Sequence, residues 1–444
     1  MDDALRRVVD DYSAFPIPPL TRREIRFPEV GETAVALVGM RRVGKSYFMY
    51  QRMQELLEQG VPRSSMLFLN LEDDRLGVDV GLPHLDRMLE YFFETGPRRH
   101  EERAYLFFDE IQAVPGWEKF ILRVINTENV RVVLTGSSAK MLTTEIATEM
   151  RGRSTAVEVL PFSFSEYLRH HGVDTPVGVA GSAVRSELAG QFRRYLAVGG
   201  FPGVQEMPDI DRSNALQEYV ELVLFRDVVE RHDVQNLVAL RRLTARLVSG
   251  FAREFTLAKV HGFLESQNVK VAEATLREYH EHLQDARLLY STWVRRQSEA
   301  ARMRNPRISY VVDPGLARAV AHPSVEDTGY LLQNAVYLEL RRRYGRVHHA
   351  AISHFTSGDG GVDFVVDDRE SGPLVLQVAA SMSDERTRER EIRGARVAMR
   401  EVGTGRATVI TLSEAGSLDV DEGSIEIVPA WRWMLLREGA LSEL

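Results

Sequence analysis

The stretch that most constrains the fold lies at residues 35–46. Four apolar residues, Val35–Val38, run directly into Gly-Met-Arg-Arg-Val-Gly-Lys-Ser, which fits the pattern G-x-x-x-x-G-K-[ST] in full. The apolar residues that follow recur at helical spacing. A buried strand, a glycine-rich loop and an amphipathic helix are therefore expected in that order. This context gives the pattern its structural meaning and argues against a chance match in a glycine-rich turn.

The loop has the chemistry of a phosphate-binding site. Gly39 and Gly44 let the backbone turn so that its N–H groups face inward, and the start of the next helix adds a positive dipole end. Lys45 can reach the β- and γ-phosphates of a nucleotide. The Ser46 hydroxyl can bind Mg²⁺, which prefers oxygen ligands. The expected nucleotide-binding residues are Gly39, Met40, Arg41, Arg42, Val43, Gly44, Lys45, Ser46 and Tyr47.

Composition narrows the class of protein. The 444 residues predict two to four domains, and 44% hydrophobic with 27% charged residues is ordinary for a globular chain. No apolar run reaches membrane-spanning length. The absence of cysteine excludes disulfides, thiolate zinc sites and cysteine nucleophiles, and we expect a cytoplasmic protein. The net charge of −8 means that any contact with DNA must use a local basic patch.

A second motif follows about sixty residues later. Residues 104–110 read Ala-Tyr-Leu-Phe-Phe-Asp-Glu, an apolar strand that ends in two carboxylates, as in a Walker B motif. Asp109 is expected to hold Mg²⁺ through its water shell, and Glu110 to act as the general base on the attacking water. A solvated strand end is the competing interpretation, and the preceding phosphate loop disfavours it.

Further catalytic candidates follow the next strand, at residues 130–134. Ser137 and Ser138 can orient the water or sense the γ-phosphate, although turn residues that cap the next helix are an equal alternative. Arg151 or Arg153 can act as an arginine finger, in cis or from a neighbouring subunit, and a surface arginine is the alternative. Alternating apolar strands and amphipathic helices predict a parallel sheet with helices on both faces and phosphates at the carboxyl ends of its strands.

These motifs together resemble a large prokaryotic family of AAA+-type P-loop ATPases that carry a conserved C-terminal region of unknown function. The resemblance also rests on Leu-Thr-Gly-Ser-Ser-Ala at residues 134–139 and on the stretch from residue 160 to 168. It implies ATP binding at residues 39–46, Mg²⁺ and water activation at Asp109 and Glu110, and a sensor among residues 135–138. The family usually has Ala-Gly-Arg preceded by Leu where this chain has Met150 and Arg-Gly-Arg, so Arg153 matches the family arginine better than Arg151.

The middle of the chain has the pattern of a winged helix. Three helices and a strand are expected over residues 236–293, and the would-be recognition helix, 272–284, carries Glu273, Glu278 and Glu281 against Arg277 alone. Because this surface repels phosphates, we favour contact with protein over DNA. A basic cluster follows and is either a DNA-contacting wing or a solvated loop. Its members are Arg295, Arg296, Arg302, Arg304 and Arg307.

The last section resembles a restriction-endonuclease-like fold, with a helix, Gly-Val-Asp on one strand, and a polar pair on the next. Glu339 and Asp363 are candidate metal ligands in that arrangement. Gln377 stands where the second strand carboxylate is expected, and Ala379 stands where a lysine is expected. A neutral amide and a methyl group cannot supply those roles, so we expect no DNA cleavage.

The predicted division is an AAA+-type ATPase domain at 1–165, a helical region at 166–235, a winged-helix-like region at 236–320, and an inactive nuclease-like α/β domain at 321–444. The leading hypothesis is a Mg²⁺-dependent ATPase whose nucleotide state acts on its C-terminal domains. The alternatives are an ATP-regulated binding switch with little turnover and an ATP-coupled DNA-processing protein. A homo-oligomer is compatible with all three, and the sequence identifies no protein partner.

Overall fold

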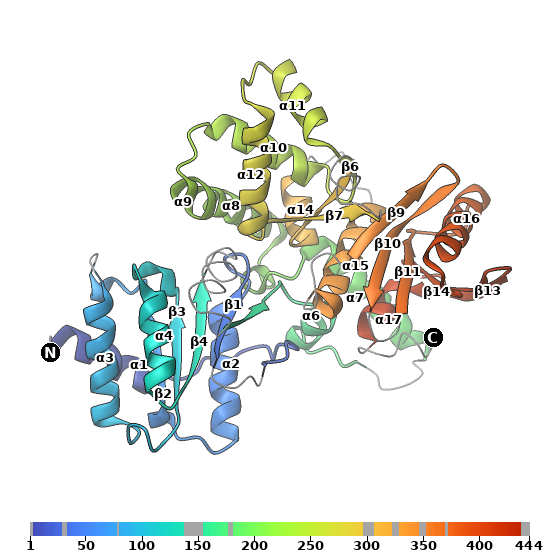
Figure 1. The fold of residues 1–444 in the computed structure, drawn as a ribbon. Coiled ribbons are helices and arrows are strands. Elements are labelled where there is room, and N and C mark those ends of the chain that lie inside the picture. The colour runs from blue at the N-terminus through green and yellow to red at the C-terminus, as the bar shows by residue number, and fades with distance from the viewer. Residues whose placement is uncertain are drawn as a thin grey trace. The chain divides into compact units, whose positions relative to one another are not determined.

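The computed structural model describes residues 3–28, 33–77, 80–136, 154–175, 181–295, 306–321, 328–345, 352–368 and 372–436. The chain divides into two compact units (Figure 1). The first contains Met1–Leu160 and Asp285–Arg287, and the second contains Pro161–Gln284 and Leu288–Leu444.

The first unit is built on a five-stranded parallel sheet with the order β2-β3-β4-β1-β5. Every residue of β1 is buried, as expected for a parallel strand covered on both faces. The strands are β1 (Ala34–Val38), β2 (Met66–Asn70), β3 (Ala104–Asp109), β4 (Val130–Gly136) and β5 (Ser154–Glu158). This parallel sheet is the architecture predicted from the alternating strand and helix patterns.

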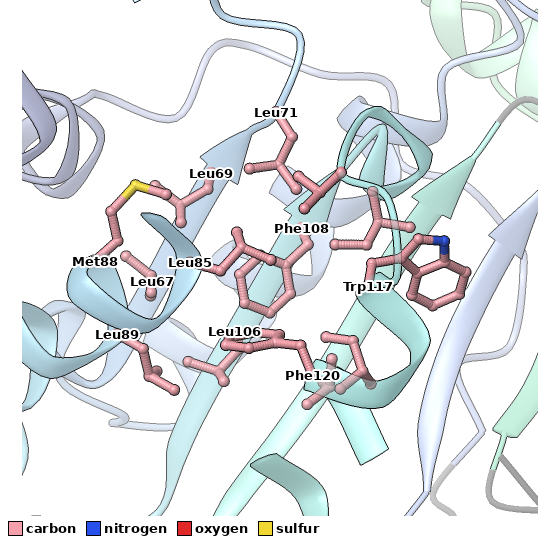
Figure 2. Packing of buried hydrophobic residues seen from close by; sticks show 14 of the residues in the cluster. Leu67, Leu69, Leu71, Leu85, Met88, Leu89, Leu106, Phe108, Trp117 and Phe120 are labelled. Carbon is pink, nitrogen blue, oxygen red and sulfur yellow. The ribbon is translucent and has the colours of Figure 1, made fainter. Parts of the chain in front are cut away.

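Helices cover both faces of this sheet. On one face, Leu106 and Phe108 of β3 pack with residues of α3 (Leu82–Thr95) and α4 (Trp117–Thr127), as Figure 2 shows. On the other face, the Phe68 ring of β2 lies 5.0 Å from Tyr50 of α2 (Lys45–Glu58), measured between ring centroids. Helix α1 (Asp3–Ala14) contributes Leu5, Val8 and Val9 to the same core as α3 and α4. Successive strand residues point to opposite faces, so one apolar strand supplies both cores. Short 3₁₀ turns lie at Arg63–Ser65, Asp74–Leu76 and Ile111–Ala113.

The second unit begins with helices and continues into a mixed sheet. In the helical region, α8 (Asp209–Val223) continues through a π-helical segment, Leu224–Val229, into the short α9 (Glu230–His232). The remaining helices are α6 (Phe164–His170), α7 (Ser182–Val198), α10 (Leu237–Ser249), α11 (Leu257–Ser266), α12 (Glu273–Asp285), α14 (Pro314–Val320), α15 (Thr328–Tyr344), α16 (Glu385–Val402) and α17 (Ala430–Leu435). A 3₁₀ turn lies at Pro202–Val204.

The sheet of the second unit has nine strands in the described residues, with the order β13-β14-β12-β11-β10-β9-β7-β8-β6. The strands are β6 (Glu254–Phe255), β7 (Leu289–Val294), β8 (Arg307–Val311), β9 (Ile352–Ser357), β10 (Gly360–Asp368), β11 (Gly372–Val378), β12 (Arg406–Thr411), β13 (Gly416–Val420) and β14 (Gly423–Pro429). Because β7 pairs with β9, this sheet crosses the boundary expected at residue 320. The four-part division therefore stays a prediction.

Four elements of the second unit were absent from the sequence prediction: β6, β8, α14 and β13. The two-residue β6 is too short to give a periodic pattern, and β8 begins at Arg307, the last arginine of the basic cluster, whose charges indicate a loop. In the described part of the chain, no helix is long and apolar enough to cross a membrane.

Candidate nucleotide site

The glycine-rich loop leaves β1 at Val38 and enters α2 at Lys45. It turns tightly, with φ of 71° at Arg42 and 95° at Gly44. A Cβ atom on Gly39 would lie 2.3 Å from the backbone oxygen of Val159, so no side chain fits there without displacing the segment after β5. The strand–loop–helix context predicted for this motif is thus present in the fold.

The side chain of Lys45 lies over this loop and is buried. Its ammonium donates hydrogen bonds to the backbone oxygens of Gly39, at 3.1 Å, and Met40, at 3.3 Å. Phosphate oxygens are stronger partners for an ammonium than neutral carbonyls are, because both groups are then charged. Lys45 is therefore held at the loop that would receive the phosphates.

Among the other loop residues, Met40 and Val43 have fully buried side chains, so these two residues can offer only backbone groups to a ligand. Arg41 forms an ion pair with Glu72 at 3.9 Å. Tyr47 is half exposed, and its ring centroid lies 5.7 Å from that of Tyr50.

The carboxylate of Asp109 lies at the end of β3, beside the start of α2. It is 5% exposed and accepts a hydrogen bond from the Thr135 hydroxyl, and the Ser46 hydroxyl is close enough to act on its pKa. Burial raises the pKa of Asp109, while the hydrogen bonds from Ser46 and Thr135 and the charge of Lys45 act in the opposite direction. Two protein oxygens, from Asp109 and Ser46, thus lie together beside the loop.

This donor set fits Mg²⁺. The ion prefers oxygen ligands, keeps several waters, and is usually held by one or two carboxylates together with the phosphates of a substrate. The described residues contain no group of three or more His, Cys, Asp or Glu side chains that could hold a metal ion by themselves. A site of one carboxylate and one hydroxyl therefore suits a metal that arrives with a nucleotide.

Glu110 follows Asp109 but has a different environment. Its backbone is left-handed, with φ of 53°, and its N–H donates to the Thr135 hydroxyl oxygen at 2.9 Å. Its carboxylate accepts a hydrogen bond from the side-chain amide of Gln112. Thr135 therefore connects the Asp109 carboxylate to the backbone of Glu110, and it is fully buried.

Two of the predicted catalytic residues, Ser137 and Arg153, lie outside the described residues, as do Ser138 and Arg151. The structure brings together Lys45, Ser46, Asp109 and Thr135. Sequence reasoning missed the contact of Gln112 with Glu110, although a polar residue two positions after the paired carboxylates was a usable signal.

The polar residues of the predicted nuclease-like site are engaged with one another. Gln377 accepts a hydrogen bond from the Asp363 N–H at 3.0 Å and donates to the Glu391 carboxylate at 2.5 Å. Asp363 accepts from the N–H of Val378 at 2.9 Å, and burial raises the pKa of Asp363 to about 7. Glu391, on α16, was not foreseen because it lies outside the strand motif.

Glu339, the other predicted metal ligand, has different partners. Its two carboxylate oxygens accept from Arg342 at 3.2 Å and from Arg343 at 2.8 Å. Both arginines also donate to backbone oxygens, including Pro161 for Arg342 and Trp433 for Arg343. The carboxylate thus serves a buried ion-pair network.

Two members of the basic cluster are described. Arg295 forms an ion pair with Asp367 at 2.6 Å. The guanidinium carbon of Arg307 lies 3.7 Å from the ring centroid of Trp293, and burial lowers the pKa of Arg307. These contacts reduce the positive charge that the pair presents to a phosphate backbone. Arg296, Arg302 and Arg304 lie outside the described residues.

Comparisons with known proteins give two family matches. Residues 31–168 match the model described as an AAA domain, and residues 189–327 match a model described as a domain of unknown function (DUF8612). The uncharacterized protein MJ1544 of Methanocaldococcus jannaschii is 28% identical over 437 residues, covering 96% of this chain and 94% of the relative. An uncharacterized protein of Haemophilus influenzae is 27% identical over 305 residues, covering 69% and 73%, respectively.

Two solved structures are also similar. The Walker-type ATPase PABY2304 of Pyrococcus abyssi aligns with a TM-score of 0.43 at 16% identity, covering 69% of this chain and 99% of that chain. The Thermotoga maritima RuvB Holliday junction branch migration motor aligns with a TM-score of 0.29 at 16% identity, covering 59% and 82%, respectively. At these TM-scores we base no functional argument on either structure. The stretch that is similar to the AAA domain model, residues 31–168, thus contains Lys45, Ser46 and Asp109.

Proposed function

We propose that this protein binds ATP with Mg²⁺ at residues 39–47 and hydrolyses it slowly. Lys45 would bind the β- and γ-phosphate oxygens, and Ser46 and Asp109 would hold the metal. Bound Mg²⁺ supplies charge neutralisation at the phosphates. Glu110 takes the proton of the attacking water, so that hydroxide adds to the γ-phosphorus while the bond to the β-phosphate oxygen breaks.

The single observation that carries this proposal is the placement of Lys45, Ser46 and Asp109 around one loop, with Thr135 linking Asp109 to Glu110. These groups lie at the carboxyl ends of parallel strands. A buried ammonium, a hydroxyl and a carboxylate there suit a nucleoside triphosphate with its metal. Ser137 as a sensor and Arg153 as a finger, in cis or from a second copy in a homo-oligomer, complete the proposed machinery.

A titration with labelled ATP tests the binding step. Lys45→Ala removes the ammonium that meets the phosphates, and we expect nucleotide affinity to fall by at least about tenfold, the effect of one lost charge-assisted hydrogen bond. Arg98→Ala is a matched control, because Arg98 is an exposed cation whose partners are the nearby Glu101 and Glu102. Equal ATP binding by Lys45→Ala and the parent protein would show that the nucleotide site is assigned wrongly.

A binding switch with little turnover is the second candidate function. It is supported by the hydrogen bond from Gln112 to the Glu110 carboxylate, because an amide donor on the base competes with a water for that oxygen. In that case bound ATP, and not its hydrolysis, would change the state of the protein. The Glu110 and Gln112 variants described in the Discussion distinguish the two functions.

The regions after the ATPase domain are proposed to respond to nucleotide state as interaction domains. Helices α10, α11 and α12, the β7–β8 hairpin and the pairing of β6 with β8 support a winged helix. The glutamates of α12 and the engaged Arg295 and Arg307 favour a protein partner over DNA.

We also propose that the restriction-endonuclease-like region does not cut DNA. Gln377 and Ala379 lack the needed groups, and the Glu339 carboxylate is paired with two arginines. Incubation of the full chain with supercoiled DNA, in Mg²⁺ or Mn²⁺ and with or without ATP, should leave the DNA intact. Cleavage that disappears in Asp363→Ala would overturn this part of the proposal and favour an ATP-coupled DNA-processing protein.

A further inference from the structure

The segment of residues 15–28, which precedes the sheet of the first unit, is hydrogen-bonded to α2 through the backbone of Arg23. The backbone N–H of Arg23 donates to the side-chain oxygen of Gln51 at 2.6 Å, and the side-chain nitrogen of Gln51 donates to the backbone oxygen of Arg23 at 3.2 Å. Gln51 is 4% exposed. One glutamine thus satisfies both backbone groups of Arg23, as a neighbouring strand would.

This attachment directs the Arg23 side chain beneath the phosphate loop. Arg23 is 6% exposed, and its guanidinium donates to two backbone oxygens, that of Val43 at 3.0 Å and that of Leu160 at 2.5 Å. A guanidinium can serve two acceptors at once because its donors lie in a rigid planar fork. Burying a charge is costly unless it is well hydrogen-bonded, so these contacts hold the side chain strongly.

The contact with Val43 fixes the orientation of the next amide. In a planar trans peptide, the C=O of one residue and the N–H of the next point in opposite directions. With the Val43 carbonyl held by Arg23, the Gly44 N–H is directed to the opposite side of the same peptide. Gly44 immediately precedes Lys45 and α2, where N–H groups receive phosphates.

The hydrogen bond to the Leu160 oxygen ties the Arg23 guanidinium to a second backbone segment. Leu160 lies two residues beyond β5, and the N–H of Val159 donates to the backbone oxygen of Val38 at 2.7 Å. The guanidinium therefore connects the phosphate loop to backbone that is itself hydrogen-bonded to the end of β1. Arg23 thus stabilises the loop through its backbone and is not itself one of the proposed nucleotide-binding residues.

We propose that Arg23 is a positioning residue that orients the Gly44 amide and Lys45 for the phosphates of the nucleotide. The inference rests on the proposed ATP site and adds a residue that lies sixteen positions before Gly39, the first residue of the motif. Because Arg23 supports phosphate binding equally in the ground state and the transition state, its loss should raise KM while changing kcat little.

Arg23→Ala tests this in the full chain, with ATP affinity and steady-state ATP hydrolysis as measurements. We expect ATP affinity to fall by about tenfold or more, as for one lost hydrogen bond to a charged group. Adding about 20 mM guanidinium chloride, far below concentrations that unfold proteins, should restore part of the affinity. The same concentration of sodium chloride should not, because sodium cannot donate hydrogen bonds to the two carbonyls.

Arg23→Lys and Arg22→Ala complete the design. Lysine keeps the charge but lacks the planar fork, so Arg23→Lys should retain part of the affinity, and it provides a second variant should Arg23→Ala fail to fold. The side chain of Arg22 is 67% exposed and lies 3.8 Å from Glu55 in an exposed ion pair, so Arg22→Ala should bind ATP like the parent.

Parent-like ATP affinity in folded Arg23→Ala, or in Arg23→Lys if the alanine variant does not fold, would overturn the inference while leaving the ATP site intact. A weakened Arg23→Ala that guanidinium does not restore would also overturn it, because the loss would then be general destabilisation. Failure of the parent protein itself to bind ATP would instead overturn the proposed function.

Discussion

The two carboxylates at the end of β3 are adjacent but occupy different environments. Asp109 is buried and accepts a hydrogen bond from the Thr135 hydroxyl, whereas Glu110 has a left-handed backbone and its carboxylate accepts a hydrogen bond from Gln112. A left-handed conformation costs roughly 1 kcal/mol or more at a residue other than glycine. The hydrogen bond from the Glu110 N–H to Thr135 helps to offset it. Different environments can give two neighbouring acids different roles, and the proposed function assigns Asp109 to the metal and Glu110 to the attacking water.

The first prediction, at this scale, concerns Gln112. Its amide holds one oxygen of the Glu110 carboxylate, and removing it leaves the base less well placed. Gln112→Ala should lower kcat by about tenfold, within the range of general-base contributions, with ATP affinity unchanged. The measurement is steady-state phosphate release at saturating ATP, alongside a binding titration. Gln54→Ala, an exposed glutamine on α2, is the matched control.

A rise in turnover in Gln112→Ala would contradict this prediction. Gln112 would then restrain Glu110 instead of positioning it, and the protein would fit the binding switch. A fall in ATP affinity as large as the fall in kcat would also count against the assigned role.

At the scale of elements, the sequence predicts helices, strands and loops that follow one another in the chain. It does not predict contacts between residues that are far apart in the chain. The strand, loop and helix around Lys45 were predictable because their pattern is contiguous. The link between Arg23 and Val43, twenty residues apart, and the pairing of Arg23 with Gln51 were not predictable, because nothing in the sequence distinguishes Arg23 from the neighbouring Arg22 and Arg26. The same limit hid Glu391, which reaches Gln377 from a separate helix.

The second prediction, at this scale, concerns the joint between α14 and the turn after α7. Asp313 caps α14 by accepting from the Leu316 N–H at 2.9 Å and also accepts from the Gly200 N–H at 2.6 Å. Burial raises the pKa of Asp313 to about 6, against the opposing effect of these backbone hydrogen bonds. The pKa of Asp313 is higher in the folded protein than in the unfolded chain. Its contribution to the free energy of unfolding is therefore fully present below the unfolded-state pKa. It is lost as pH rises through about 6.

Thermal unfolding of the parent and of Asp313→Asn, followed at several pH values on both sides of pH 6, provides the measurement. From about pH 4.5 to pH 7, the parent should lose on the order of 2 kcal/mol through this carboxyl, by linkage of its shifted pKa. Asp313→Asn should be less stable at low pH, because an amide nitrogen cannot accept a hydrogen bond, but its stability should depend less on pH. Parallel curves for the two proteins would show that Asp313 does not titrate in this way.

At the scale of the molecule, strand pairing organises the second unit in a way that composition cannot reveal. The pairing of Trp293 with Ser353 and of Val294 with His354 joins β7 to β9 in parallel. The residues between those strands contain the boundary placed at 320, and no composition shift indicates that the strands on its two sides share a sheet. The parallel sheet of the first unit was predictable because its pairing follows from repeated strand–helix alternation.

The third prediction tests the central claim, that Glu110 is the base of an ATPase site formed with Lys45, Ser46 and Asp109. Glu110→Gln keeps the shape of the side chain but cannot take a proton from water. We predict that ATP binds to this variant as tightly as to the parent, while phosphate release falls by about a hundredfold or more. Glu101→Gln, at an exposed carboxylate paired with Arg98, controls for the loss of one charge. Phosphate release from Glu110→Gln at the parent rate, with ATP bound, would contradict the account.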